Sequence, residues 1–66
     1  MIKLYAGIHC GVCKMLGFRL QQKNIEYEEI TDEELMSELG ILNVPVLEVE
    51  GKRMNSFEAS EWITKQ

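Results

Sequence analysis

The sequence predicts a single α/β domain over residues 1–66, with a mixed four-stranded sheet flanked by three helices in the order β-α-β-α-β-β-α. Three observations support this prediction. Four short runs are apolar or alternate in polarity, as strands do. Three segments show the apolar spacing of helices. Glycines and capping residues separate these segments, and a chain of this length is sufficient for one small domain only.

The first three elements are expected to be a strand, a helix and a second strand. Residues 2–6 alternate in polarity, and residues 25–30 form a run whose glutamates suit a sheet edge; a helix between them would make the two strands parallel. This helix begins at residue 10 or 11 and ends near Lys23, followed by a left-handed Asn24. Gly17 interrupts it, which favours close packing against a neighbouring element. The positions expected to face inward are Cys13, Leu16 and Leu20.

A short helix and an antiparallel hairpin are expected next. Thr31-Asp32-Glu33-Glu34 has the Thr-x-x-Glu form of a capping box, which predicts a helix capped by Thr31 and closed by Gly40. Residues 46–50 and 52–55 are expected to be strands joined by a two-residue turn at residues 50–51. The residues expected to face inward from the short helix are Leu35, Met36 and Leu39.

A third helix is expected to run to about Thr64, with Asn55 or Ser56 as its N-cap. Its inner face is expected to consist of Ala59, Trp62 and Ile63. We interpret Phe57 and Trp62 as core aromatics, because so small a domain has few large side chains to fill its interior. The alternative is that both line a surface for docking a partner.

The composition argues against several functional classes. Hydrophobic residues make up 45% of the chain, which indicates a globular core. The formal net charge is −4 without a basic cluster, so nucleic acid is not expected as a partner. No apolar run approaches the roughly 18 residues that span a membrane, and the first residues lack the layout of a signal peptide. We therefore expect a cytoplasmic monomer whose acidic residues form a solvated surface.

The two cysteines of the chain, Cys10 and Cys13, form a Cys-x-x-Cys motif between the first strand and the first helix. In a reducing compartment such a pair favours a catalytic or metal-binding role over a passive cross-link. A helix N-terminus stabilises an anion, and cysteines in such motifs reach pKa values of roughly 3.5 to 7. We expect Cys10 to attack a substrate disulfide and Cys13 to resolve the mixed disulfide, with no cofactor beyond the two sulfurs.

Three neighbours of the cysteines are candidates for contacting substrate. Gly11 and Val12 separate the cysteines and carry no charge, so we expect them to tune the reduction potential rather than to act as acid or base. His9 precedes the nucleophile, and its imidazolium would lower the pKa of Cys10 or contact a partner. The alternative for His9 is an exposed loop residue with little effect, because adjacency in sequence does not direct its ring at the sulfur.

A metal site is the alternative use of the same motif. Tetrahedral zinc requires four protein ligands in a structural site. Cys10, Cys13 and His9 leave one subunit a ligand short. Zinc or iron–sulfur binding would therefore require a dimer or a bound thiol, and no metal ligands are assigned within the single chain.

Several stretches, which span nearly the whole chain, together point to one family. They are Leu4-Tyr5 leading into Cys10-Gly11-Val12-Cys13, the strand at residues 25–30, Asn43-Val44-Pro45-Val46-Leu47, and Glu50-Gly51-Lys52. In these stretches the chain resembles the thioredoxin superfamily, and more narrowly the glutaredoxins and glutaredoxin-like redoxins. The resemblance implies a thioredoxin fold, Cys10 as nucleophile and Cys13 as resolving thiol. It also implies a cis Val44–Pro45 bond facing the dithiol, where the Val44 backbone would pair with a bound peptide or glutathione.

The sequence departs from the glutaredoxin pattern in ways that bear on the electron donor. Gly11-Val12 replaces a common Pro-Tyr, Gly7 replaces a lysine that helps bind glutathione, and residues 55–58 replace Gly-Gly followed by Asp. These differences favour thioredoxin reductase over glutathione as the donor. Residues 56–57 resemble the NrdH-type redoxins, which take electrons from thioredoxin reductase. The resemblance to those redoxins implies a disulfide-containing acceptor such as ribonucleotide reductase.

Overall fold

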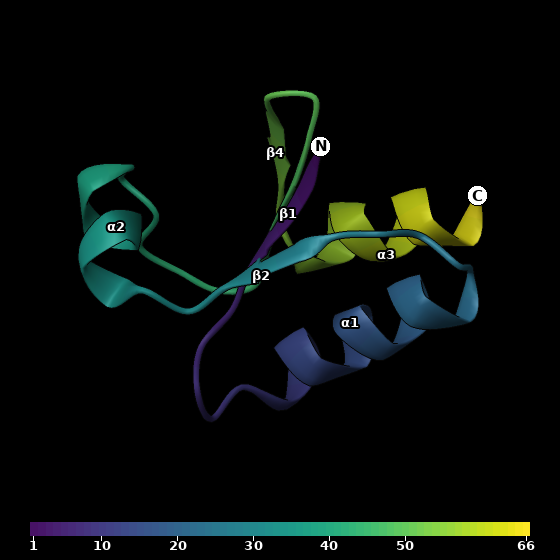
Figure 1. Cartoon of the computed structure of the whole chain (residues 1–66), viewed down its shortest axis with the longest axis horizontal. Coiled ribbons are helices and arrows are strands. Elements are labelled where there is room, and N and C mark those ends of the chain that lie inside the picture. Colours follow the sequence, from purple (N-terminus) through teal and green to yellow (C-terminus); the bar gives the residue numbers. More distant parts are fainter.

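The computed structural model describes residues 1–66 and confirms the predicted order of strands and helices (Figure 1). The strands are β1 (Ile2–Tyr5), β2 (Glu28–Ile30), β3 (Val46–Val49) and β4 (Lys52–Met54). The helices are α1 (Gly11–Gln22), α2 (Glu33–Glu38) and α3 (Ser56–Thr64). None of the three helices combines the length and apolar character needed to span a bilayer.

The strands form one mixed sheet in the order β2-β1-β3-β4. β1 pairs in parallel with β2, as expected for strands joined by a helix, and antiparallel with β3. β3 and β4 form the predicted hairpin. Its turn residues Glu50 and Gly51 have φ angles of 50° and 83°, as a type I′ turn requires. β2 lies at the sheet edge, as its glutamates predicted.

Alternation along β1 directs neighbouring side chains to opposite faces of the sheet. Leu4 lies in the main core with Leu47 and Met54, which follow it across the sheet, and this core is covered by α1 and α3. Tyr5 belongs to a smaller cluster with Met36 of α2 on the other face. Helix α1, which contains Cys13 and follows Cys10, therefore packs on the larger core, beside α3 (Figure 1).

Polar side chains hold α1 against α3. Arg19 donates hydrogen bonds to Ser60 Oγ at 2.5 Å and to Thr64 Oγ1 at 2.6 Å. Lys23 Nζ donates to the carbonyl oxygen of Gln66 at 3.0 Å. Arg19 therefore contacts α3 itself, whereas Lys23, one turn further along, contacts the residue beyond its C-terminus. The two helices thus run in the same direction. Their N-termini consequently lie at the same end of the molecule.

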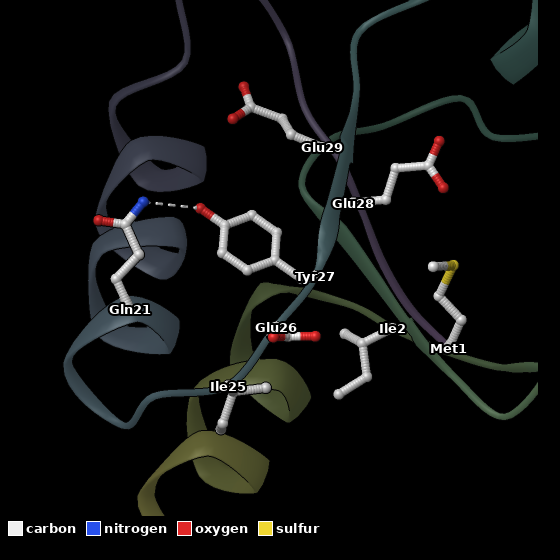
Figure 2. Close-up of a pocket in the computed structure, with 8 residues that line it drawn as sticks. All are labelled: Met1, Ile2, Gln21, Ile25, Glu26, Tyr27, Glu28 and Glu29. Carbon is white, nitrogen blue, oxygen red and sulfur yellow. Dashed lines mark hydrogen bonds between the residues drawn. The ribbon is translucent and has the colours of Figure 1, made fainter.

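The middle of α1 packs closely against the segment that leads into β2. Gly17 is buried, and a Cβ atom built on it would lie 2.8 Å from the hydroxyl oxygen of Tyr27. Figure 2 shows this hydroxyl accepting a hydrogen bond from Gln21 Nε2 at 3.3 Å. The prediction that close packing explains Gly17 is confirmed.

The cap of α2 and the extent of β2 differ from the sequence predictions. Asp32, not Thr31, is the N-cap, and its carboxylate accepts hydrogen bonds from the backbone N–H groups of Glu34 and Leu35. Aspartate is the better capping residue of the two, because its carboxylate is the stronger acceptor. β2 begins at residue 28 rather than 25, because the preceding residues pack Ile25 and Tyr27 on the main core instead of pairing with β1.

Two side chains that were predicted to face inward are exposed. Leu35 of α2 is 36% exposed, while its neighbour Met36 is buried, because a helix of one and a half turns presents only a narrow face to the sheet. Phe57 of α3 is 70% exposed and is therefore not a core residue. It lies two positions before the buried Ala59, on nearly the opposite side of the helix. Trp62 packs against the main core, as predicted.

Candidate active site around Cys10 and Cys13

Cys10 and Cys13 meet at the N-terminus of α1. Cys10 is the N-cap residue, with an extended backbone (φ −109°, ψ 106°), and Cys13 lies in the first turn. Their Cα atoms are 5.2 Å apart, within the usual range for a disulfide, and their sulfurs are bonded to each other. The structure therefore describes the oxidised form of the Cys-x-x-Cys pair.

The two cysteines differ in their access to solvent. Cys13 is 2% exposed, because its position on α1 places it on the same inward face as Leu16 and Leu20. Cys10 precedes the helix and is partly exposed. A group that approaches from solvent therefore meets Cys10 first.

The helix N-terminus provides hydrogen-bond donors to the outer sulfur. The backbone N–H of Cys13 donates to Cys10 Sγ at 3.1 Å, which is the bond that an N-cap side chain normally accepts. The first turn of α1 contains no acidic residue that would oppose a negative charge at this position. The positive end of the helix dipole is thus available to stabilise a thiolate at Cys10.

The Val44–Pro45 segment lies next to the cysteines, with a cis peptide bond as the resemblance implied. A Cβ atom built on Gly7 would lie 3.3 Å from Val44 Cγ2 and 3.6 Å from Cys10 Cβ. Gly7 therefore lies between Val44 and Cys10, in a space that leaves little room for a side chain. Pro45 is buried, whereas Val44 is 37% exposed. The fold brings together residues that are far apart in the sequence.

The remaining predicted site residues border Cys10 at the surface. His9, Gly11 and Val12 are all exposed. His9 makes no hydrogen bond and no salt bridge, so no polar contact orients its ring toward the sulfur of Cys10. A Cβ atom built on Gly11 would have no neighbour within 4 Å, which leaves open space in front of the first helical turn.

Two exposed apolar residues in loops near this site were not among the predicted site residues. Ile8, in the loop before Cys10, is 65% exposed, and Leu42, which lines a small pocket with Gly7 and Val44, is 88% exposed. Both lie in stretches that form neither strand nor helix, so no periodicity assigns them to a core. The signal that would have found them is an apolar residue in the loop before Cys10 and another in the loop before the Val44–Pro45 bond.

The largest hollow of the surface is remote from the cysteines. It has a volume of about 970 Å³ and lies between the start of β1 and the segment leading into β2 (Figure 2). Its lining includes neither cysteine and neither residue of the cis peptide bond. It is wide and open, so the chemistry of the cysteines, not cavity size, identifies the candidate site. The residues that line it are Met1, Ile2, Gln21, Ile25, Glu26, Tyr27, Glu28 and Glu29.

The side-chain arrangement does not assemble a metal-binding cluster within the chain. No group of three or more His, Cys, Asp or Glu side chains is placed to hold a metal ion. Cys10 and Cys13 are bonded to one another. A metal site that used them would need both a reduced pair and ligands from outside the chain.

No protein-family model matches the chain, and no curated protein matches it either. Among solved structures, the chain is similar to a monomeric glutathione S-transferase from the major human hookworm parasite Necator americanus, with a TM-score of 0.77 and 26% sequence identity. The similarity covers 97% of this chain and 34% of the transferase, so the chain spans about a third of that protein's length. The predicted fold class is thereby confirmed: the chain has a thioredoxin-like fold, with a four-stranded mixed sheet and three helices.

Proposed function

We propose that the protein is a small thiol-disulfide oxidoreductase that transfers electrons to disulfides of other molecules, as glutaredoxins and glutaredoxin-like redoxins do. The observation that carries this proposal is the Cys10–Cys13 disulfide at the N-terminus of α1, with the outer cysteine accessible and the inner one buried. The thioredoxin-like fold supports it, because a Cys-x-x-Cys motif between a strand and a helix of such a fold is typical of redox proteins.

The proposed reaction is an exchange of thiols and disulfides. The Cys10 thiolate attacks a substrate disulfide R–S–S–R′, forms a Cys10–S–S–R bond and releases R′–S⁻. Cys13 then attacks the Cys10 sulfur, forms the Cys10–Cys13 disulfide and releases R–S⁻. Two electrons pass to the substrate; the proton of the Cys13 thiol passes to one released thiolate, and the other takes from water the equivalent of the proton that Cys10 lost on ionisation. A donor dithiol, or two glutathione molecules, regenerates the reduced protein by the reverse exchange.

The helix start supports Cys10 as the attacking group. In the reduced protein, the Cys13 N–H that lies 3.1 Å from Cys10 Sγ would donate to the thiolate, and the helix dipole adds to that stabilisation. Burial of Cys13 disfavours its thiolate in the same state. The two environments therefore favour the order of attack given above.

We propose thioredoxin reductase rather than glutathione as the electron donor. Gly7 supplies no cation beside the dithiol, and the one charged residue that lines the pocket next to Gly7 is the acidic Glu33. At the N-terminus of α3, Asn55 and Glu58 form a reciprocal capping box, so Asn55 Oδ1 already occupies the backbone N–H of Glu58 at 2.9 Å. The carboxylates of glutathione thus find few free donors at either place. A disulfide-containing protein such as ribonucleotide reductase is the proposed acceptor, in a reducing compartment such as the cytoplasm.

Trapping of the mixed disulfide tests the roles of the cysteines. Cys13→Ser should accumulate a covalent adduct on Cys10 when it is mixed with a peptide disulfide, because the resolving thiol is absent. Mass spectrometry should detect this adduct, and dithiothreitol should release it. Cys10→Ser, the matched control, should form far less adduct. If Cys10→Ser traps the substrate and Cys13→Ser does not, the assignment of roles is wrong.

Two coupled assays of NADPH consumption test the donor. One supplies thioredoxin reductase, and the other supplies glutathione with glutathione reductase, each with the same peptide disulfide as acceptor. Turnover with thioredoxin reductase alone is the expected result. Turnover with glutathione alone would show that the chain binds glutathione through contacts other than those of the glutaredoxin pattern. The absence of turnover in both assays would contradict the proposed function.

A further inference from the structure

A small pocket lies beside the outer cysteine, between the loops around the dithiol and helix α2. Its volume is about 260 Å³. Its lining includes Gly7, Leu42 and Val44, and a Cβ atom built on Gly7 would lie 3.6 Å from Cys10 Cβ and 3.3 Å from Val44 Cγ2. Pockets for small molecules usually have volumes of about 300–1,000 Å³. The pocket is therefore better suited to a single side chain than to a whole ligand.

Helix α2 provides the opposite wall of this pocket and its only charge. Met36 and Ser37 contribute an apolar and a neutral surface, and Glu33 is the one charged residue in the lining. The single salt bridge of the chain joins Arg53 to Glu48, so the carboxylate of Glu33 has no cationic partner. The pocket thus combines an apolar wall with an unpaired negative charge.

We infer that this pocket receives the side chain next to the reacting cysteine of a substrate protein, and that Glu33 makes it select lysine or arginine over glutamate or aspartate there. The inference rests on the proposed function, which places the substrate sulfur on Cys10. Successive residues of an extended chain lie about 3.3 Å apart, so the neighbour of a cysteine bound to Cys10 reaches a pocket that begins at Gly7. The aliphatic part of a lysine would pack on Met36 and Leu42 while its ammonium group approaches Glu33.

The same carboxylate acts against anionic substrates. A carboxylate next to the reacting cysteine would enter the pocket and face Glu33 without a cation to offset the repulsion. Glutathione has such a group, because its cysteine is followed by a C-terminal glycine. Selection therefore arises from repulsion of one class of substrate as well as from attraction of the other.

The test uses three peptide disulfides that differ only in the two residues beside the cysteine, which are lysine, alanine or glutamate. The reduced protein is mixed with each symmetrical disulfide, and the released peptide thiol is quantified after acid quenching. Each second-order rate constant is divided by the rate constant of the same peptide with dithiothreitol, because flanking charges also alter the intrinsic reactivity of a disulfide. The readout is the ratio of the normalised rates for the lysine and glutamate peptides.

The wild-type ratio should be about five, which is the scale of an exposed ion pair, and it should fall as the salt concentration rises. Glu33→Gln should bring the ratio close to one. Ser37→Lys, which places a cation in the same pocket one helical turn from Glu33, should offset its charge and also lower the ratio towards one. Glu38→Gln removes a charge from the same helix outside the pocket and should retain the wild-type ratio.

A wild-type ratio near one, or a ratio that persists in Glu33→Gln, would overturn the inference. If Glu38→Gln lowers the ratio as much as Glu33→Gln does, the inference is also overturned. The preference for lysine would then come from the net negative charge of the whole protein, not from Glu33. In each of these cases reduction of the alanine peptide would leave the proposed function standing. If none of the three peptides is reduced, the proposed function fails and the inference fails with it.

Discussion

Replacing Gly17 by alanine should destabilise the protein or leave its stability unchanged, although alanine is the better helix former. The new Cβ atom would lie 2.8 Å from the hydroxyl oxygen of Tyr27, which is closer than van der Waals contact. The Tyr27 ring packs against the main core and is partly buried, so it is not free to swing away. Either α1 or the segment before β2 must therefore move.

Two terms of opposite sign determine the size of this effect. Glycine to alanine in a helix interior stabilises by about 1 kcal/mol. Overpacking of a well-packed site typically destabilises by about 1–3 kcal/mol. The expected net change for Gly17→Ala is a destabilisation of about 0–2 kcal/mol. In so small a domain, 1 kcal/mol changes the melting temperature by about 4–8 °C.

The sign should reverse in the Tyr27→Phe background. Without the hydroxyl oxygen, the nearest atoms to the new Cβ are ring carbon Cζ at 3.6 Å and Leu4 Cδ2 at 3.7 Å, which are ordinary contacts. Gly17→Ala should then stabilise by about 1 kcal/mol. The coupling energy between the two substitutions equals the cost of the clash, about 1–3 kcal/mol.

Urea unfolding of the oxidised protein, in all four combinations of the two substitutions, measures this coupling. Gly11→Ala provides a matched control on the same helix, because its Cβ would meet nothing within 4 Å and should show no coupling to Tyr27. Gly17→Ala could instead raise the free energy of unfolding by the same amount in the wild-type background and in the Tyr27→Phe background. In that case the contact between α1 and Tyr27 is not as described.

Three further predictions concern the elements that position the site. Asn55→Ala removes the N-cap of α3 and should destabilise the protein by about 1 kcal/mol in urea unfolding. Gly51→Ala places a side chain at φ 83° in the hairpin turn and should lower stability by about 1 kcal/mol, measured by thermal unfolding. Arg19→Met removes two hydrogen bonds to α3, so hydrogen exchange at the end of α3 should accelerate several-fold, equivalent to about 1 kcal/mol.

Each of these predictions has a control in the same chain. Asn43→Ala changes an exposed loop asparagine with no side-chain hydrogen bond and should alter stability by less than about 0.5 kcal/mol. Gly51→Asn should be tolerated better than Gly51→Ala, because asparagine adopts positive φ angles more readily. Lys14→Met alters an exposed cation on α1 and should not affect exchange in α3. Equal effects of a variant and its control would contradict the corresponding explanation.

The order of elements was predictable because local signals specify it. The hairpin turn at Glu50-Gly51, the left-handed Asn24 at φ 58° and Gly40 at φ 77° lie where the sequence placed them. Each depends on the conformational preference of one or two residues, which the surrounding structure does not need to supply. The N-cap of α2 was less predictable, because Thr31 and Asp32 are adjacent and both are suitable capping residues. Only the position at which α2 begins in the folded protein shows that Asp32 is the cap.

The sequence also predicted that Cys10 and Cys13 lie between the first strand and the first helix, as the structure confirms. The burial of Cys13 followed from its spacing with Leu16 and Leu20, because helical periodicity places residues three and four apart on one face. The exposure of Phe57 contradicts the argument that a small domain must bury its aromatics. Composition does not decide which aromatic side chains are buried, because burial depends on which side of α3 meets the sheet.

By itself, then, the sequence determined the order of the elements, the position of the two cysteines between strand and helix and the polarity of the edge strand, all of which depend on residues close together in the chain. Only the tertiary structure decided which distant residues meet. The approach of Val44 to Gly7 and Cys10 depends on how β1 and β3 pair, and the pocket lined by Glu33 depends on where α2 lies against them. Such contacts are set by packing and strand pairing across the whole chain, so no local pattern of residues encodes them.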